Sequence, residues 1–197
     1  MTVIGLTGSF GTGKTFVASI FRSFGAKVID ADVIAHRVIK KGSPAYKKIV
    51  AAFGRDILGL SGEIDRRRLA ALTFASPSAV VKINRMVHPE VIRVIKAGIS
   101  AGADKDAVVV VDAPLLIEAR LLNIVDKLVV VNSSKKRQIE RCIKKFRIKQ
   151  AEVLKRIRIQ MSMKRKLKMA DFVVKNDSTR SSTRKQVRKV WEEVVWK

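Results

Sequence analysis

The chain has 197 residues and 47% of them are hydrophobic, which suits one α/β core with an inserted subdomain and excludes a disordered chain. No apolar run approaches the roughly 18 residues of a membrane span, and the single cysteine, Cys142, excludes an intramolecular disulfide and a cysteine-based zinc cluster. The net charge of +24 admits either a nucleic-acid-binding surface or a basic cleft for phosphorylated small molecules. A first strand near residue 3 leaves no room for a signal peptide, so we expect a cytoplasmic protein without a membrane partner.

A glycine-rich stretch follows the first predicted strand, Val3-Ile4-Gly5-Leu6. It fits the pattern G-x-x-x-x-G-K-[ST] with the residues Gly8-Ser9-Phe10-Gly11-Thr12-Gly13-Lys14-Thr15. An amphipathic helix is predicted after it, because apolar residues recur at Val17, Ile20, Phe21 and Phe24. The pattern therefore predicts a phosphate-binding loop of the P-loop type. In such a loop Lys14 would reach the β- and γ-phosphates and the Thr15 hydroxyl would bind Mg²⁺.

Two acidic residues close the second predicted strand, Lys27-Val28-Ile29, which ends on Asp30-Ala31-Asp32. Their position predicts carboxylates at the carboxyl edge of the sheet, where open α/β sheets bind ligands. Either one could accept a proton from an attacking hydroxyl or orient it. The alternative is that they only cap the helix predicted from about residue 33 to 40, and we favour a functional role for Asp32.

The segment from about residue 40 to 103 is mostly helical in pattern. Helices are predicted over 45–53, 66–74 and 80–99, with a loop over 54–64. Pro89 lies inside the last of these helices, so a kink or a break is expected near His88. His88 is a candidate phosphate ligand or a structural residue. The run Arg66-Arg67-Arg68 is either a solvated face or a source of one arginine for a phosphate.

Two stretches rich in valine predict buried parallel strands, Ala107–Asp112 and Lys127–Asn132. The first ends on Asp112, which is the Walker B pattern of a carboxylate that holds Mg²⁺. Pro114 stops this strand, and Glu118 comes within reach of the same edge. A second candidate magnesium ligand is therefore Asp112.

Basic helices are predicted after the second of these strands, from about 135 to 145 and from about 150 to 169. They occupy the place of the lid in small P-loop kinases, where cations and exclusion of water assist phosphoryl transfer. A last strand is predicted over 170–176 and a closing amphipathic helix over the residues from 187 to 195.

The basic charge is concentrated in the last third of the chain. Residues 135–197 hold 22 Lys or Arg against 6 Asp or Glu, which gives +16 of the net +24. Aromatic residues make up 6% of the chain, and no helix-turn-helix, zinc-finger or RNP signature is present. We therefore expect only nonspecific attraction of nucleic acid through the charge.

The chain resembles the dephospho-coenzyme A kinase family over essentially its full length. The resemblance is carried by the phosphate loop, Val28-Ile29-Asp30-Ala31-Asp32, Ile64-Asp65-Arg66-Arg67-Arg68-Leu69, Ile83-Asn84 with His88-Pro89, Pro114-Leu115-Leu116-Ile117-Glu118, Gln138 with Arg141, Gln160, and Ala170-Asp171-Phe172-Val173-Val174-Lys175-Asn176. It implies a P-loop kinase fold of the α/β class, a five-stranded parallel sheet flanked by helices, with a helical substrate-binding insertion and a helical lid. It also implies transfer of the ATP γ-phosphoryl group to the ribose 3′-hydroxyl of dephospho-coenzyme A.

The resemblance assigns roles residue by residue. Asp32, Lys14 and Arg141 are the candidate catalytic residues. The candidate ATP-binding residues are Gly8, Ser9, Phe10, Gly11, Thr12, Gly13, Lys14, Thr15 and Asn176. The candidate substrate-binding residues are Asp30, Asp32, Arg66, His88, Pro114 and Leu115. The candidate Mg²⁺ ligands are Thr15 and Asp112.

We expect three parts in the chain, and two alternative functions remain open. The expected parts are a nucleotide-binding core (1–39, 104–133 and 170–197), a substrate domain (40–103) and a lid (134–169). We expect a monomer or weak homo-oligomer. The alternatives are another small-molecule or nucleotide kinase on this scaffold, or a basic protein that binds nucleic acid and uses ATP as a switch.

Two positions depart from the family pattern. The family usually carries Arg-Asp four residues beyond Arg141, where this chain has Lys145-Phe146. Either Lys145 serves as a lid cation without the bidentate fork of arginine, or Arg147 replaces it. Phe10 stands where a smaller aliphatic residue is common, so the outer wall of the phosphate loop is expected to differ.

Overall fold

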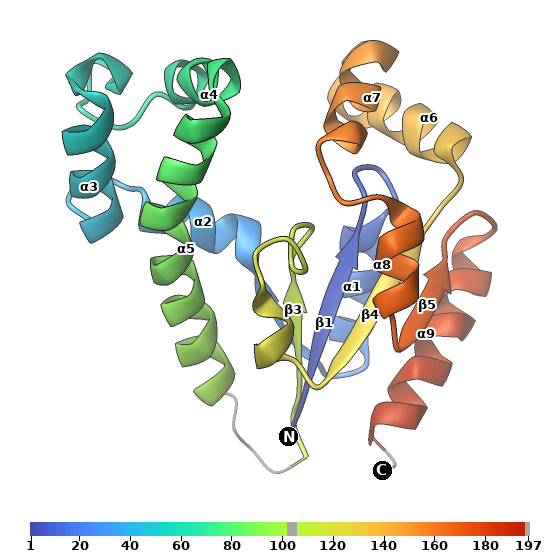
Figure 1. Ribbon diagram of the computed structural model, residues 1–197. Coiled ribbons are helices and arrows are strands. Elements are labelled where there is room, and N and C mark those ends of the chain that lie inside the picture. Colours follow the sequence, from blue (N-terminus) through green and yellow to red (C-terminus); the bar gives the residue numbers. More distant parts are fainter. Residues whose placement is uncertain (102–105, 196–197) are drawn as a thin grey trace. The chain divides into compact units, whose positions relative to one another are not determined.

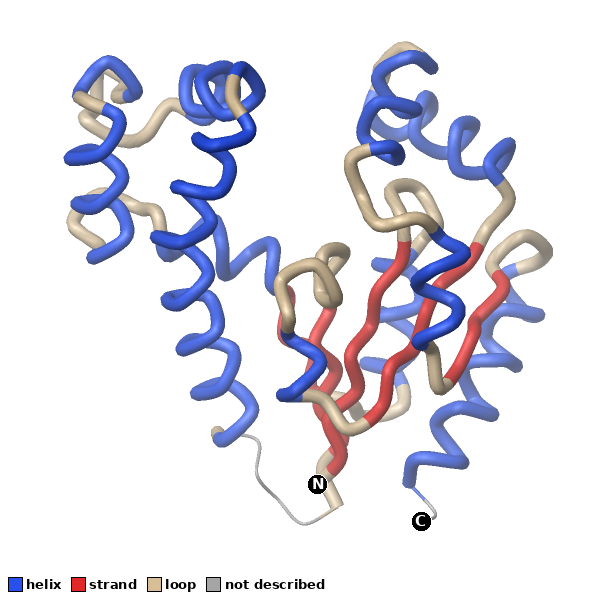
Figure 2. The backbone as a smooth tube through the Cα atoms, in the orientation of Figure 1, coloured by secondary structure: helices blue, strands red, loops and turns tan. Residues whose placement is uncertain are grey.

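Five parallel strands form one sheet within the described residues, in the order β2-β3-β1-β4-β5 (Figure 2). They are β1 (Thr2–Gly8), β2 (Lys27–Asp30), β3 (Val108–Asp112), β4 (Lys127–Asn132) and β5 (Phe172–Lys175). The structure is a computed structural model that describes residues 1–101 and 106–195, without the side chains of residues 66, 73–75 and 77. The parallel sheet implied by the sequence is confirmed.

The carboxyl ends of the strands meet at one edge of the sheet. In the register of the ladder, Asp112 at the end of β3 lies beside Leu6 of β1 and Asp30 of β2. The main chain of Ala113 continues this ladder by donating a hydrogen bond to the Leu6 carbonyl. The apolar run of β3 is buried along its whole length, as a central strand covered on both faces requires. The acids that close β2 and β3 are therefore neighbours at the edge from which the glycine-rich loop also leaves.

Helices cover both faces of the sheet. On one face α1 (Lys14–Ser23) and α9 (Arg180–Val195) pack against the strands (Figure 1). Phe21 of α1 and Val187 of α9 belong to the core cluster that they form with alternate residues of β1, β3, β4 and β5. On the opposite face α8 (Met163–Met169) lies over β4. The connection from β3 to β4 contains the short 3₁₀ helix η2 (Leu121–Ile124).

The chain separates into two compact units, one of residues 1–30 with 98–197 and one of residues 31–97. The second unit is helical. It holds α2 (Ala31–Val38), α3 (Pro44–Phe53), η1 (Arg55–Ile57), α4 (Arg66–Ala75) and most of α5 (Pro77–Ser100). Ile49, Ile57 and Leu69 form its own buried cluster. The first unit also carries α6 (Lys135–Phe146) and α7 (Gln150–Arg158).

One prediction about helices is wrong. The helix predicted from 150 to 169 is divided, because residues 159–162 leave the helix between α7 and α8 and the Ser162 hydroxyl caps α8. Near His88, where a kink or a break was expected, α5 continues through Pro89 without a break. Pro89 and Arg85, whose carbonyl loses its helical partner, are both exposed, so water can satisfy that carbonyl.

Among the described residues, no helix has the length and apolar character needed to cross a membrane.

Candidate active site

The glycine-rich loop turns tightly between β1 and α1. Gly11 and Gly13 adopt φ angles of 83° and 89°, in the left-handed region that favours glycine. A Cβ at Gly11 would stand 2.7 Å from the Cys142 sulfur, and one at Gly13 would collide with the Asn176 amide. Both positions therefore require glycine for backbone conformation and for space.

The N-terminus of α1 lacks the side-chain partners that close most helices. Its N-cap is Gly13, which has no side chain to accept a hydrogen bond, and the first turn contains no acidic residue. The first N–H groups of a helix have no carbonyl partners within the helix and carry its positive dipole end. This helix start is thus suited to bind an anion such as a phosphate.

Lys14 lies at this anion site and forms an ion pair with Asp112 at the end of β3. Both side chains are largely buried, with exposed fractions of 14% and 5%. The pair joins the first residue of α1 to the carboxyl edge of the central strand. It holds the ammonium group beside the loop, where a bound phosphate would compete with Asp112 for it.

The residues predicted to bind Mg²⁺ supply the right chemistry. Thr15 follows Lys14 in the first turn of α1 and is exposed, and Asp112 provides a carboxylate at the adjacent sheet edge. Mg²⁺ prefers hydroxyl, carboxylate, phosphate and water oxygens. The described residues contain no cluster of three or more His, Cys, Asp or Glu that would form a complete metal cage. The pair fits a magnesium ion that takes its remaining ligands from a nucleotide and water.

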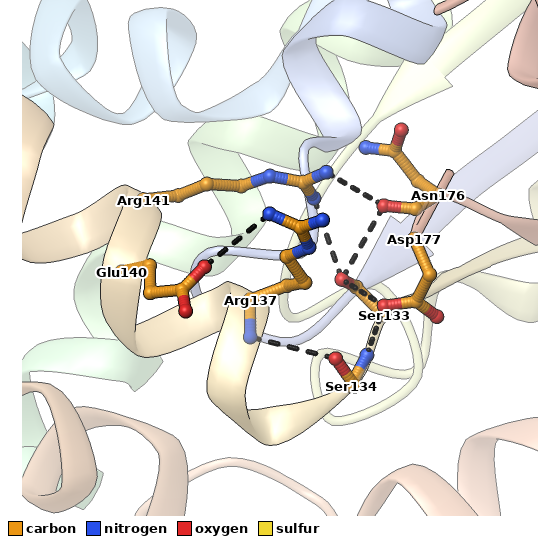
Figure 3. Close-up of polar contacts among 7 residues, drawn as sticks. All are labelled: Ser133, Ser134, Arg137, Glu140, Arg141, Asn176 and Asp177. Atoms are coloured by element: carbon orange, nitrogen blue, oxygen red, sulfur yellow. Dashed lines mark hydrogen bonds and ion pairs between the residues drawn. The ribbon is translucent and has the colours of Figure 1, made fainter. Parts of the chain in front are cut away.

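Arg141 of α6 contacts the glycine-rich loop, and Figure 3 shows it beside Ser133 and Asn176. Its guanidinium group donates to the carbonyls of Asn176 at 2.7 Å and Thr12 at 3.3 Å, and to the Ser133 hydroxyl at 3.3 Å. One arginine therefore connects α6, the phosphate loop and the end of β5. These contacts hold the guanidinium group of Arg141 beside the glycine-rich loop. The prediction that Arg141 acts near the phosphates concerns this same region.

Asn176 is buried and its side-chain amide is used by the protein itself. The amide nitrogen donates to the Thr12 carbonyl at 2.8 Å, and the amide oxygen accepts from the Thr183 hydroxyl at 3.0 Å. Its main chain is also bonded within the protein, since the N–H donates to the Asn132 carbonyl and the carbonyl accepts from Arg141. The side chain fixes the shape of the loop.

Asp177 organises the start of α6 beside this group. Its carboxylate accepts from the Ser134 N–H at 2.7 Å and from the Ser133 hydroxyl at 3.0 Å (Figure 3). The Ser134 hydrogen bond is the largest cause that lowers the pKa of Asp177, and the charge of Arg141 acts in the same direction. The Ser134 side chain then caps α6 at Arg137.

The acids after β2 stand at the junction of the two units. Asp30 ends β2 and pairs in register with Asp112. Asp32 is exposed in the first turn of α2. Because consecutive Cα atoms are 3.8 Å apart, Asp32 lies within about 8 Å of Asp30 through the chain.

Pro114 and Leu115 follow β3 in a loop that a buried lysine supports. The Pro114 carbonyl accepts hydrogen bonds from the Lys166 ammonium at 2.8 Å and the Thr7 hydroxyl at 3.1 Å. Lys166 is wholly buried and forms an ion pair with Glu118 at 3.0 Å. The Leu115 side chain is exposed.

The remaining predicted substrate residues lie in the helical unit. His88 is partly buried in α5, and burial lowers the pKa of its imidazole, so it is neutral at pH 7 and able to donate a single N–H. Arg66 begins α4, and its side chain lies outside the described residues. Its neighbour Arg68 bonds the carbonyls of Asp56 and Leu58, which gives it a structural role.

Sequence reasoning missed the role of Lys166. In a chain with many basic residues, the sequence does not indicate which lysine is buried. Only the structure shows that Glu118 is the partner of Lys166. It also missed the side chain of Gln160, whose oxygen accepts the N–H of Phe10 at 2.9 Å. Gln160 was among the residues that carried the resemblance, but its spacing indicated no partner.

Comparison with known proteins gives the same relationship by sequence and by structure. The family model described as dephospho-CoA kinase matches residues 2–182. A dephospho-CoA kinase of Bacillus cereus is 39% identical over 196 residues, covering 95% of this chain and 94% of that protein. The crystal structure of TT1252 from Thermus thermophilus matches with a TM-score of 0.87 and 29% identity, over 98% of this chain and 96% of the other. A dephospho-CoA kinase from Campylobacter jejuni has a TM-score of 0.74 and 25% identity, over 98% and 97%.

Proposed function

The chain belongs to the dephospho-CoA kinase family, and we propose that it transfers the γ-phosphoryl group of ATP to the ribose 3′-hydroxyl of dephospho-coenzyme A. The products are coenzyme A and ADP, and the reaction is the final step of coenzyme A biosynthesis. The new O–P bond forms at the 3′-oxygen as the bond between the γ-phosphorus and the bridging oxygen of ADP breaks. The hydroxyl proton leaves to a base.

The observation that carries this proposal is the anion site at the start of α1. Its N-cap glycine leaves the first N–H groups available to phosphate oxygens, and Lys14 stands beside them in contact with Asp112. Phosphoryl transfer needs charge neutralisation and positioning more than covalent chemistry from the protein. Gly8 to Thr15 bind the donor phosphates in this proposal, with Lys14 at the β- and γ-oxygens.

The acceptor is activated by Asp32. Asp30 lies beside Asp112 in the sheet register, and Asp32 follows it by two residues. In this proposal the Asp32 carboxylate accepts the proton of the 3′-hydroxyl, or orients that hydroxyl in line with the γ-phosphate. Asp30, Arg66, His88, Pro114 and Leu115 contact the rest of dephospho-coenzyme A.

Positive charge from the lid and from a metal completes the site. Arg141, docked on Thr12 and Asn176, adds a cation at the phosphate side of the loop. Mg²⁺ would be held by the Thr15 hydroxyl and by Asp112, directly or through water, and when bound it neutralises the β- and γ-phosphate oxygens. Asn176 and the neighbouring main chain are assigned to the adenine pocket in this proposal.

The test is a coupled ADP-release assay with purified protein, Mg-ATP and a panel of acceptors. Dephospho-coenzyme A should give coenzyme A and ADP, identified by the mass of the product. Phosphorylation of adenosine or shikimate in place of dephospho-coenzyme A would overturn the proposal and favour another small-molecule kinase.

We also propose that the protein acts in the cytoplasm as a monomer or weak homo-oligomer, without a specific nucleic-acid partner. Its charge of +24 attracts nucleic acid only nonspecifically. A gel shift that persists at 200 mM salt with one sequence over another would contradict this.

A further inference from the structure

The two departures from the family pattern meet in space. Phe10, in the phosphate loop, stacks on Phe146, the last residue of α6, with ring centroids 5.3 Å apart and an interplanar angle of 22°. Phe146 is 44% exposed, so this stack is not part of a core cluster. An aromatic ring of the donor loop is therefore held by an aromatic ring of the lid region.

Each of the two stacked rings has a cation beside it. The guanidinium carbon of Arg156, in α7, lies 5.2 Å from the centre of the Phe10 ring. The Lys145 ammonium lies 5.3 Å from the centre of the Phe146 ring. Both distances fall within the range of cation–π attraction. Of these two cations, Arg156 contacts the loop and Lys145 contacts its own neighbour in the lid region.

Arg156 is also oriented from within its helix. It donates a 2.6 Å hydrogen bond to Glu152, one turn earlier in α7. A third connection comes from Gln160, which accepts the main-chain N–H of Phe10. One loop residue is thus contacted by α6, by α7 and by the segment that follows α7.

The charge of Arg156 also affects the pKa of Cys142, which lies beside the loop. Cys142 lies against Gly11, and burial raises the pKa of its thiol. The charge of Arg156, followed by that of Lys145, acts in the opposite direction. Arg147, the other arginine near this position, is exposed at the end of α6.

We propose that Phe10 and Phe146 form an aromatic latch that holds Arg156 at the rim of the phosphate loop, where Arg156 serves as the second lid cation. This inference rests on the proposed function, because the cation acts on the phosphoryl group in transfer. Phe10 and Phe146 are positioning residues, and Arg156 is the group that contacts the phosphates. Lys145 and Arg147 do not fill that role.

The latch is weak enough to open for nucleotide exchange. An aromatic pair of this geometry changes an equilibrium by about 2- to 10-fold. Phe146 is exposed and Phe10 is only partly buried, so neither ring is locked by burial. The latch therefore shifts the lid toward the position that presents Arg156, and it does so without preventing release.

The kinetic experiment compares Phe10→Leu, Phe146→Ala, the double variant, Arg156→Ala and Arg156→Lys in turnover of Mg-ATP with dephospho-coenzyme A. Arg156→Ala should lower kcat by about 100-fold, with KM for dephospho-coenzyme A unchanged, and Arg156→Lys should recover part of it. Each phenylalanine variant should lower kcat about 3- to 10-fold. The double variant should be no worse than the stronger single variant, because the rings act as a pair.

The controls are Ile159→Ala and Arg147→Ala. Ile159 is an exposed apolar residue of the same region, and its loss should leave kcat within about twofold. Loss of activity in Arg147→Ala or Lys145→Ala with a normal Arg156→Ala enzyme would overturn the proposal. Effects of Phe10→Leu and Phe146→Ala that multiply independently would also overturn it.

A second measurement separates failure of the latch from failure of the proposed function. Hydrogen exchange of the ligand-free protein should show faster exchange at the Phe10 amide and in α6 and α7 for Phe146→Ala, and no change for Ile159→Ala. Unchanged exchange in Phe146→Ala refutes the latch. Faster exchange in Phe146→Ala, as expected, together with no coenzyme A formed by the wild type refutes the function and leaves the latch standing.

Discussion

The side-chain nitrogen of Asn176 donates a 2.8 Å hydrogen bond to the Thr12 carbonyl, which lies 164 residues earlier in the chain. This bond connects the end of β5 to the phosphate loop, and Thr183 of α9 holds the other end of the amide. The loop is thus fixed by the residue that follows β5 and by α9, as well as by its own glycines.

Replacement of Asn176 by alanine should therefore affect both stability and nucleotide binding. It leaves the buried Thr12 carbonyl and Thr183 hydroxyl without this partner, at a cost of about 1–3 kcal/mol in the free energy of unfolding. We expect KM for ATP to rise while KM for dephospho-coenzyme A stays constant. Urea unfolding and steady-state kinetics measure both, and the exposed Asn123→Ala is the control. Equal changes in the two KM values would contradict a local effect on the loop.

Removal of Lys166 tests the support under Pro114. The ammonium is fully buried against Glu118 and the Pro114 carbonyl. Lys166→Met leaves the partly buried Glu118 carboxylate without this ion pair, so the free energy of unfolding should fall by about 3 kcal/mol. Lys127→Met is the matched control, because the pair of Lys127 with Asp171 is longer, at 3.8 Å, and more exposed. Its cost should be below about 1 kcal/mol. Equal unfolding midpoints for the two variants would show that Lys166 does not stabilise the fold more than Lys127 does.

The carboxylate of Asp177 gives a pH signature. The pKa of Asp177 is lowered in the folded protein, chiefly by the Ser134 N–H, so its stabilising effect is present above the unfolded pKa near 3.8. That effect is lost as the pH falls through the lower folded value. Asp177→Asn should therefore be less stable than the wild type at pH 7, and the difference should shrink below pH 4. A difference that is constant from pH 7 to pH 3 would contradict the assignment.

Lys14→Ala should weaken both nucleotide binding and turnover. It removes the cation of the anion site and leaves the buried Asp112 carboxylate without this ion pair. We expect KM for ATP to rise and kcat to fall by about 100-fold or more, as for loss of other preorganised electrostatic groups. The exposed Lys47→Ala should match the wild type. A loss confined to KM would mean that Lys14 binds ground state and transition state equally.

The strands and the phosphate loop were predictable because each has a local signature. The run of valines in β3 indicates burial on both faces, and the spacing from Gly8 to Lys14 fixes a phosphate loop. The division of α7 from α8 was not predictable from helical periodicity. There the chain leaves the helix because Gln160 and Met161 bond Phe10 and Glu118, which are distant in sequence.

The same limit applies to the candidate site. Lys14 and Asp112 were expected at one edge, and the structure joins them in an ion pair. The contacts of Arg141 with Thr12 and Asn176 depend on how α6 docks on the loop, which no spacing in the sequence reports. Near His88 the sequence predicted a kink or a break, and the structure excludes the break: α5 continues through Pro89 because an exposed helical carbonyl can bond to water. Propensity alone does not tell which side of the helix a proline faces.

The most direct test of the account is Asp32→Asn, assayed for coenzyme A formation and for ATP binding in the same preparation. The amide keeps the size of the side chain and removes the base, so kcat should fall by about 10²–10⁴-fold while the Kd for ATP stays within about twofold. Near wild-type turnover would contradict the account, and it would reassign Asp32 to the start of α2.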